Sequence, residues 1–369
     1  MSNEALSKGA LTAKPRILFV DDEPNILQGI RRLLFRFQKQ WEIDFAESGK
    51  EALEKFAAQP FDFLVSDMRM PNMDGAELLQ RIKTKYPDTI RLVLSGQSDR
   101  DQIMRSVKLA HRYFTKPCQE DELIETISGL VQWRQKIVSS EVKKIASSIS
   151  FVPSNVGIIN ELVAELEKTA PNIGVVRNLV CQDIGLSIKL IQIVSSSFFG
   201  ERKVIYDPGH AATLLGMDLL RKLLVEAEIY AEGDEFGQKI ARLCNASIEM
   251  ANAAREIAEV RYDDVELQQQ AYLSGLLTNV GKMILMHYAP EKYQQVVERV
   301  KEKRISLVDA ESEIFGLTHT EVGGYILGLW GLPEKVIEAV YYYKDPAKFD
   351  REKFHPVTAV FLADTLDGI

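Results

Sequence analysis

Five short apolar runs alternate with amphipathic stretches in the first third of the chain, and this alternation strongly constrains the fold. The runs that predict strands lie at 16–20, 42–46, 61–66, 90–94 and 112–115. The stretches with apolar residues at helical spacing are 25–40, 50–58, 76–85, 99–110 and a last one from 119 onward. Strands that alternate with helices predict an α/β doubly wound fold with a five-stranded parallel sheet.

Polar side chains follow four of the predicted strands at the point where each strand ends. The first is followed by Asp21 and Asp22, the third by Asp67, the fourth by Ser95 and the fifth by Lys116. Because the carboxyl ends of parallel strands share one edge of a sheet, we expect these groups to converge. Three neighbouring carboxylates repel one another without a cation, and hard oxygen ligands with room for water suit Mg²⁺. The pattern indicates a site at which Asp67 attacks a phosphoryl group, a recognised use of a carboxylate nucleophile.

Lys116 and the metal would neutralise the incoming phosphoryl group, and Ser95 would donate a hydrogen bond to one of its oxygens. A different interpretation starts from the same residues taken singly. Asp21 and Asp22 would then cap the next helix, and Lys116 would be an ordinary surface charge. The coincidence of all five residues at matching strand ends favours the site.

Residues 15–130 resemble the receiver domain of two-component response regulators, a CheY-like, flavodoxin-like fold, and the resemblance includes each position named above. It implies that a sensor histidine kinase or a small phosphodonor phosphorylates Asp67. It also implies that Asp21, Asp22, Asp67 and the backbone carbonyl of Arg69 hold Mg²⁺.

The resemblance further implies how the domain switches. Tyr113 would be the aromatic residue that turns inward when Ser95 moves toward the phosphoryl group, and the peptide bond between Lys116 and Pro117 would be cis. Charge added at Asp67 would then bias a bistable element.

Residues 131–148 are predicted as a helical connector, because the chain from 119 to 148 contains no Pro. Val138, Val142, Ile145 and Ile149 recur at intervals of 4, 3 and 4, which is the spacing of a coiled coil. Two interpretations remain open. The stripe either pairs with a second copy and supports a homodimer, or packs on the domain that follows.

Residues 149–369 are predicted as an all-α domain, since no strand-like alternation occurs there. The predicted helices are 156–168, 175–180, 186–195, 211–231, 236–260, 267–288, 291–303, 306–315, 318–329, 333–343 and 356–366.

Several stretches of this half then form a set with a family resemblance. They read DIGLSIKL at 183–190, SSSFFG at 195–200, HAATLLG at 210–216, SGLLTNVGK at 274–282, FGLTHTEVGG at 315–324 and LWGLP at 329–333. Together they resemble the HDOD domain, an output domain related to the HD phosphohydrolases. The resemblance implies an HD-like helical fold.

The His-Asp pair that names the HD superfamily falls on Thr278 and Asn279 in this chain. An earlier family His would lie near Ala246, and the later His-His would fall near Tyr343 and Lys344. Thr and Asn are poor ligands for a catalytic transition metal, which prefers imidazole and carboxylate groups.

Only His319 and Asp364 survive as candidate ligands, and two groups on different helices do not build a hydrolytic metal site. His319, like His210 and His287, is therefore interpreted as a structural histidine. We expect no cofactor in this domain and no enzymatic activity from it.

Composition excludes several classes of protein. The net charge of −8 argues against a sequence-independent nucleic-acid binder. No stretch reaches the roughly 20 apolar residues that span a membrane. Three widely spaced cysteines indicate a reducing compartment. Residues 1–14 read as a polar, disordered leader without the apolar core of a signal peptide. These features predict a protein of the cytoplasm, and the resemblance to response regulators implies a bacterial one.

The sequence thus predicts a phosphorylation-controlled response regulator whose degenerate HDOD domain contacts another signalling protein. A second interpretation is a phosphorylation-gated, metal-dependent phosphohydrolase, such as a cyclic-dinucleotide phosphodiesterase. A third is nucleotide or RNA binding without turnover, in which Tyr341, Tyr342 and Tyr343 stack on bases and Lys344 pairs with a phosphate.

Overall fold

The structure is a computed structural model that describes residues 14–96, 104–118, 120–136, 140–196, 204–226, 234–349 and 354–367. Its contacts divide the chain into two compact units, residues 1–93 and 94–369. The predicted leader lies outside the described residues, apart from Lys14. So do Val138 of the connector stripe and most of the SSSFFG stretch.

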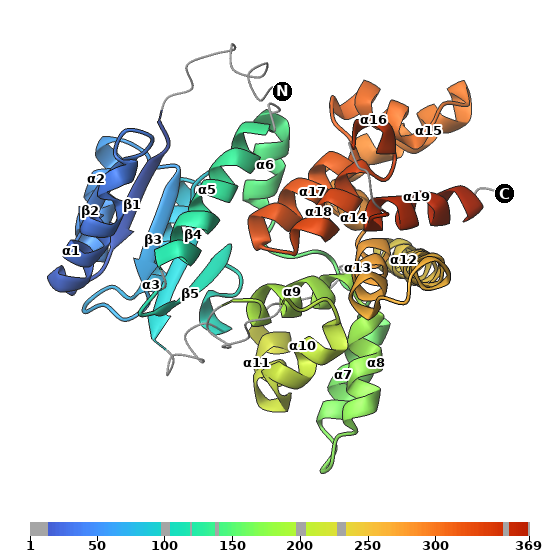
Figure 1. Cartoon of the computed structure of the whole chain (residues 1–369), viewed down its shortest axis with the longest axis horizontal. Coiled ribbons are helices and arrows are strands. Elements are labelled where there is room, and N and C mark those ends of the chain that lie inside the picture. Colours follow the sequence, from blue (N-terminus) through green and yellow to red (C-terminus); the bar gives the residue numbers. More distant parts are fainter. Residues whose placement is uncertain are drawn as a thin grey trace. The chain divides into compact units, whose positions relative to one another are not determined.

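The N-terminal part is built on a five-stranded sheet with the strand order β2-β1-β3-β4-β5 (Figure 1). β1 pairs in parallel with both β2 and β3. This order reverses direction between β1 and β3, which is the switch point where doubly wound folds place their sites. The strands are β1 (Arg16–Val20), β2 (Glu42–Ala46), β3 (Phe63–Asp67), β4 (Ile90–Gly96) and β5 (Arg112–Lys116).

The strands occur where the apolar runs predicted them, with small shifts at the ends. β3 begins two residues later than predicted, and Asp67, Ser95 and Lys116 belong to the last residues of their strands rather than following them. β3 is buried along its whole length, as expected of a central parallel strand covered on both faces.

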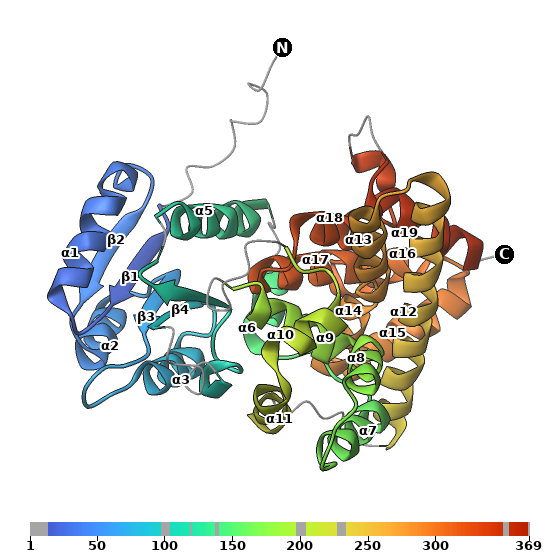
Figure 2. The same cartoon turned by 60° about the horizontal axis from the view of Figure 1, so that its bottom comes forward.

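Three α-helices of the first unit connect these strands: α1 (Pro24–Leu33), α2 (Gly49–Ala58) and α3 (Gly75–Lys85). α2 and α3 contact each other and lie side by side in Figure 2. The single helix predicted over 25–40 was wrong in extent, because the chain tightens into a 3₁₀-helix, η1 (Leu34–Phe37), after α1. Of the helix predicted over 99–110, residues 104–106 are helical and 107–109 form a turn, while 97–103 lie outside the described residues.

The described residues of the C-terminal half that lie beyond the connector are all helical or irregular, as the sequence predicted. Their helices are α7 (Val156–Leu166), α8 (Ile173–Cys181), α9 (Ile184–Val194), α10 (Pro208–Leu215), α11 (Met217–Glu226), α12 (Asp234–Arg261), α13 (Val265–Leu276), α14 (Val280–Tyr288), α15 (Pro290–Lys303), α16 (Leu307–Phe315), α17 (His319–Trp330), α18 (Glu334–Tyr342) and α19 (Pro356–Asp367).

Many of these helices begin at a side chain that accepts a backbone N–H of the first turn, which satisfies groups that the helix leaves unpaired. Asp183 accepts from the N–H of Leu186, and Thr318 forms a reciprocal capping box with Glu321. Other helices of this half begin in the same way, at Asn155, Asn172, Asp207, Asp264 and Ser306.

Two helices predicted as continuous are each broken in two. The helix predicted over 211–231 ends at Leu215, because Gly216 has a positive φ of 83° that a helix does not accommodate. The helix predicted over 267–288 ends at Leu276 and restarts at Val280. Thr278 and Asn279, the pair at the HD position, therefore lie at a break between helices.

Small residues allow the helices of this half to pack at close range. Gly275 on α13 lies against the backbone of Ala251 on α12, and Gly281 on α14 lies against the backbone of His319 on α17. A Cβ at either glycine would overlap those backbone atoms. The two glycines of the SGLLTNVGK stretch thus have a packing role. The core between α12, α13, α18 and α19 is correspondingly rich in alanine: Ala254, Ala258, Ala271, Ala339, Ala359 and Ala363.

The connector forms two helices, α5 (Glu120–Lys136) and α6 (Ser140–Ser148), with residues 137–139 outside the described residues. Val142, Ile145 and Ile149 of the predicted stripe are buried within the chain, and α6 contacts α17. These observations favour packing on the C-terminal helices over a free coiled-coil seam. The homodimer stays a prediction.

Candidate phosphoacceptor and metal site

The register of the sheet brings two acidic residues together at the switch point. Val20 of β1 pairs with Ser66 of β3. The next residue on each strand is an aspartate, so Asp21 and Asp67 face each other across the C-terminal edge. The register between β1 and β3, rather than either strand alone, determines that the two aspartates are neighbours.

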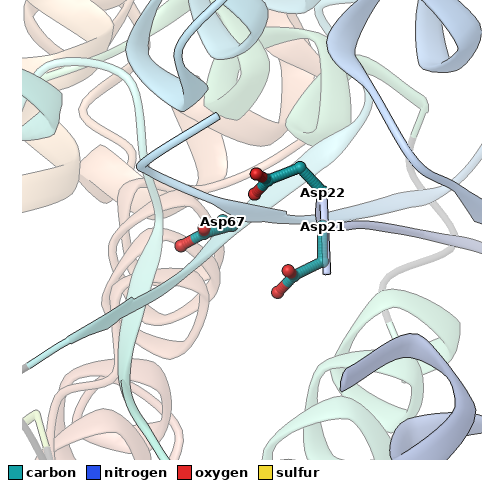
Figure 3. Close-up of side chains that lie close together, drawn as sticks. All are labelled: Asp21, Asp22 and Asp67. Atoms are coloured by element: carbon teal, nitrogen blue, oxygen red, sulfur yellow. The ribbon is translucent and has the colours of Figure 1, made fainter. Parts of the chain in front are cut away.

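The three predicted carboxylates meet at this edge. Asp21, Asp22 and Asp67 each offer an oxygen atom, and these atoms lie within 4.8 Å of one another. Figure 3 shows the three side chains gathered together, two from the end of β1 and one from β3. Asp21 and Asp67 are buried, and Asp22 is partly exposed. Such a set of oxygen ligands, open on one side, fits Mg²⁺.

The loop after Asp67 holds the carboxylate in place. The N–H of Met68 donates a 2.7 Å hydrogen bond to Asp67 Oδ1. Gly75, at the start of α3, lies so close to the carbonyl oxygen of Asp67 that a Cβ would overlap it. Asp74 caps α3 by accepting the N–H of Glu77 at 2.8 Å. The Asp-Gly pair therefore closes the loop, while the role of the Arg69 carbonyl stays a prediction.

The other predicted residues occupy their expected places in the sheet. Ser95 is buried near the end of β4, and Lys116 is the last residue of β5. The peptide bond between Lys116 and Pro117 is cis, as the resemblance implied. Tyr113 is buried and its hydroxyl donates to the carbonyl of Ser106 at 3.3 Å, and burial raises the pKa of its phenol.

In the C-terminal half, Asn279 of the HD position binds a serine of another helix. Asn279 Nδ2 donates a 2.8 Å hydrogen bond to Ser247 Oγ, and both residues are buried. This contact joins α12 to the break between α13 and α14. Within the described residues, Asp21, Asp22 and Asp67 are the only group of three acidic, histidine or cysteine side chains with metal-ligand spacing.

His319 is fully buried, and both of its ring nitrogens have protein partners. Nδ1 lies 2.7 Å from Glu311 Oε2, and Nε2 lies 2.8 Å from the Tyr343 hydroxyl. Glu311 Oε2 also accepts the backbone N–H of His319 at 2.8 Å. His319 is thus a hydrogen-bonded structural histidine in this arrangement. His287 packs between the rings of Phe151 and Phe236.

Asp364, the other surviving candidate, is held by a lysine. Lys344 Nζ lies 2.8 and 2.7 Å from the two oxygens of Asp364. Lys282 lies nearby, and burial lowers the pKa of its ammonium group, an effect that Lys344 strengthens and Glu311 opposes. The sequence reasoning missed Glu311 and assigned no role to Lys282, because nothing in the local pattern distinguishes them from surface charges on helices.

A pocket of about 460 Å³ lies among α16, α17 and α18 and includes the Tyr-rich segment of the third interpretation. Tyr341, Tyr342 and Lys344 line it together with Lys348. Both lysines already pair with aspartates, Lys344 with Asp364 and Lys348 with Asp345. Asp309 and Glu321 add further negative charge to the lining. This balance of charge disfavours an anionic nucleotide, and nucleotide or RNA binding stays a prediction.

The burial of His319 makes stability depend on pH. Burial lowers the pKa of His319 below its usual 6.5, although Glu311 opposes the shift. The unfolded chain then binds a proton more readily than the folded chain, so the free energy of unfolding rises with pH up to about 6.5 and levels off above it. We expect the full-length protein to lose stability in urea melts as pH falls below that value. His319→Gln should have a flatter profile in the same window, and parallel profiles would contradict this assignment.

Comparison with known sequences agrees with the fold. The family model of the response regulator receiver domain matches residues 17–128. That of the HDOD domain matches residues 152–346, more than half of the chain. The protein therefore belongs to the HDOD domain family and carries an N-terminal response regulator receiver domain.

Two curated relatives resemble the chain over part of their length. The "Hydrogenase transcriptional regulatory protein HoxA" of Bradyrhizobium diazoefficiens is 29% identical over 145 residues, which cover 36% of this chain and 29% of the relative. The "Response regulator protein PilR" of Pseudomonas aeruginosa is 26% identical over 214 residues, which cover 52% of this chain and 47% of the relative. The chain thus spans less than half the length of each.

Among solved structures, the signal receiver domain of an HD domain-containing protein from Pseudomonas fluorescens Pf-5 is 31% identical. The match covers 34% of this chain and all of that one, with a TM-score of 0.32.

None of the described helices is long and apolar enough to cross a membrane.

Proposed function

We propose that this protein is a signalling response regulator in which phosphorylation of Asp67 changes the conformation or pairing of its HDOD domain. The observation that carries the proposal is the convergence of Asp21, Asp22 and Asp67 at the switch point of the sheet. A buried carboxylate between two others at this edge is suited to accept a phosphoryl group when a cation balances the charge.

In the proposed reaction, a carboxylate oxygen of Asp67 attacks the phosphorus atom of a phosphohistidine or a small phosphodonor. The new P–O bond forms on Asp67 while the bond between phosphorus and the donor breaks, and the donor keeps that electron pair. Asp21, Asp22 and Asp67, with the carbonyl of Arg69, would hold Mg²⁺, which supplies charge neutralisation when bound. Lys116 would stabilise the phosphoryl oxygens, and Ser95 would donate a hydrogen bond to one of them.

The HDOD domain is proposed to act by binding another protein rather than by hydrolysis. Asn279 is bonded to Ser247, and both ring nitrogens of His319 have partners. Lys344 holds both oxygens of Asp364. Each candidate ligand would have to give up an existing bond before it could bind a metal. These contacts support a degenerate site, in contrast to the phosphorylation-gated phosphodiesterase of the second interpretation.

A metal-retention experiment distinguishes the two functions. The full chain with Asp21→Asn and Asp22→Asn, which weaken the receiver site, is incubated with Mn²⁺, Fe²⁺ and Zn²⁺, desalted and measured by elemental mass spectrometry. The wild-type chain is the reference, and both proteins are assayed against a cyclic dinucleotide. We expect no stoichiometric transition metal in the double variant and no turnover by either protein. Near-stoichiometric metal with turnover would establish a hydrolase.

The partners follow from this proposal. A sensor histidine kinase would supply the phosphoryl group, and the protein would act in the cytoplasm of a bacterial cell. The output partner would be a signalling protein, with a cyclic-dinucleotide synthase as one candidate by family analogy. A homodimer would give phosphorylation a second way to act, by changing how the subunits pair.

A further inference from the structure

An arginine beside the predicted switch residue caps a helix of the HDOD domain. Arg112 is the first residue of β5 and precedes Tyr113. Its Nη2 donates a 2.7 Å hydrogen bond to the carbonyl of Gly328, and its Nε donates at 3.1 Å to that of Leu329. Both carbonyls belong to the last turn of α17. Residues 112 and 328–329 lie in the same compact unit.

The last turn of α17 is built to receive this cation. Carbonyl groups at a helix C-terminus lack intrahelical partners and carry partial negative charge, so a guanidinium there is stabilising. Burial lowers the pKa of Arg112 to about 10, which still leaves the group charged at neutral pH. Gly331 ends the helix with a φ of 86°, and a Cβ at that residue would overlap the guanidinium group.

Two further hydrogen bonds attach the same segment to α9, and two other contacts lie beside the last turn of α17. Gln192 on α9 donates a 2.9 Å hydrogen bond from Nε2 to the carbonyl of His111. Lys189 on α9 donates at 3.2 Å to the carbonyl of Val107, and its ammonium lies 5.1 Å from the ring centre of Trp330. Trp133 on α5 packs against the last turn of α17 beside Gly328. The segment 107–112 is thus held by polar contacts to two HDOD helices.

These contacts flank the group that the receiver would move. Tyr113 bonds to Ser106, and Arg112 precedes it on β5. Successive side chains of a strand point to opposite faces, so the two residues lie on opposite sides of β5. A displacement of β5 that re-orients Tyr113 cannot leave the Arg112 guanidinium in place without bending the strand. The carbonyl groups of Gly328 and Leu329 would lose their bonds to the guanidinium or move with it.

We infer that Arg112 is a positioning residue that couples β5 to α17 and so transmits the state of the receiver to the HDOD domain. α17 also carries His319 at its other end and contacts α14 and α18, so a shift of the whole helix would act on the hydrogen bonds of His319 to Glu311 and Tyr343. The inference rests on the proposed function, because the signal it transmits is phosphorylation at Asp67.

Hydrogen–deuterium exchange of the full chain tests the coupling, with and without beryllofluoride as the phosphoryl mimic. Wild-type protein should change its exchange rates in 327–332 when beryllofluoride binds. Arg112→Ala should raise exchange there by about tenfold without the mimic, as expected for the loss of a charged hydrogen-bond donor. It should also abolish the response of 327–332 to the mimic. Arg112→Lys should restore part of both effects.

Arg221→Ala is the matched control. Arg221 also donates through Nε and Nη2 to a helix-terminal carbonyl, that of Leu166 at the end of α7, but lies on α11 and is not bonded to β5. It should raise exchange around 166 and leave the response of 327–332 intact.

The outcomes separate this inference from the proposed function. Unchanged basal exchange in Arg112→Ala, or a full response to beryllofluoride in that variant, overturns the coupling. A wild-type response absent despite verified phosphorylation of Asp67 also overturns it. If Asp67 takes no phosphoryl group at all, the proposed function fails, whereas the basal exchange of Arg112→Ala still decides whether the residue holds α17.

Discussion

Asp67→Asn is expected to reduce acid-labile phosphorylation of the full chain to background. Asn has the shape of Asp but lacks the anionic oxygen that attacks phosphorus, and an amide does not form an acyl phosphate by this route. The fold should persist, because the side chain can keep the hydrogen bond that Asp67 accepts from the N–H of Met68. The measurement is incubation with a labelled small phosphodonor and Mg²⁺, followed by quantification of protein-bound label.

Asp74→Asn is the matched control for this experiment. Asp74 lies in the same loop and caps α3 through Oδ1, a role that Asn performs about as well. It should keep wild-type labelling and wild-type melting temperature. Label that persists in Asp67→Asn while circular dichroism shows native secondary structure would place the phosphoacceptor elsewhere and remove the basis of the proposed function.

Gly281→Ala is expected to be among the most destabilising single changes in the HDOD domain. The added Cβ would overlap the carbonyl oxygen and carbon of His319 and lie 3.0 Å from the backbone nitrogen of Gly323. Backbone atoms cannot swing away as a flexible side chain can, so α14 and α17 would have to separate. Overpacking of a well-packed core costs about 1–3 kcal/mol, occasionally more, and we expect the upper end of that range. Urea unfolding of the full chain gives the value.

The neighbouring contacts make a further effect of this change measurable. Separation of α14 from α17 should disturb the bonds of His319 to Glu311 and Tyr343. Gly237→Ala, near the start of α12, is the control, because no atom lies within 4 Å of a Cβ there. It should be neutral or stabilise by up to about 1 kcal/mol, since alanine favours the helix. Equal stabilities of the two variants would show that the close approach of α14 and α17 is not maintained in solution.

Much of the receiver domain was predictable from local pattern. The apolar runs located all five strands, because buried parallel strands are continuously apolar and their ends are punctuated by polar residues. Asp21, Asp22 and Asp67 converge as predicted, since in a parallel sheet strand order and register leave them one common edge. The cis peptide bond before Pro117 was predicted from the resemblance to the receiver family, and the structure confirms it.

Helix boundaries and buried polar partners were harder to predict. The break at residues 277–279 lies within a continuous apolar pattern, and it forms where Asn279 turns to bind Ser247 on another helix. Glu311 reads as one more exposed acid on an amphipathic helix, yet it is fully buried against His319. The partner of Asn279 is 32 residues away in the sequence, and the partner of His319 lies on the preceding helix, so neither pairing follows from the pattern of a single helix.

The sequence by itself determined the two kinds of domain, the strands of the receiver and the identity of its acidic site. Those properties depend on periodicity and on residues at strand ends, which are local. Only the tertiary structure decided that Val142, Ile145 and Ile149 are buried in the chain and that Lys344 holds Asp364. It alone brought Arg112 to the end of α17. Each of these contacts joins residues far apart in the sequence, and their pairing follows from how helices pack rather than from any local pattern.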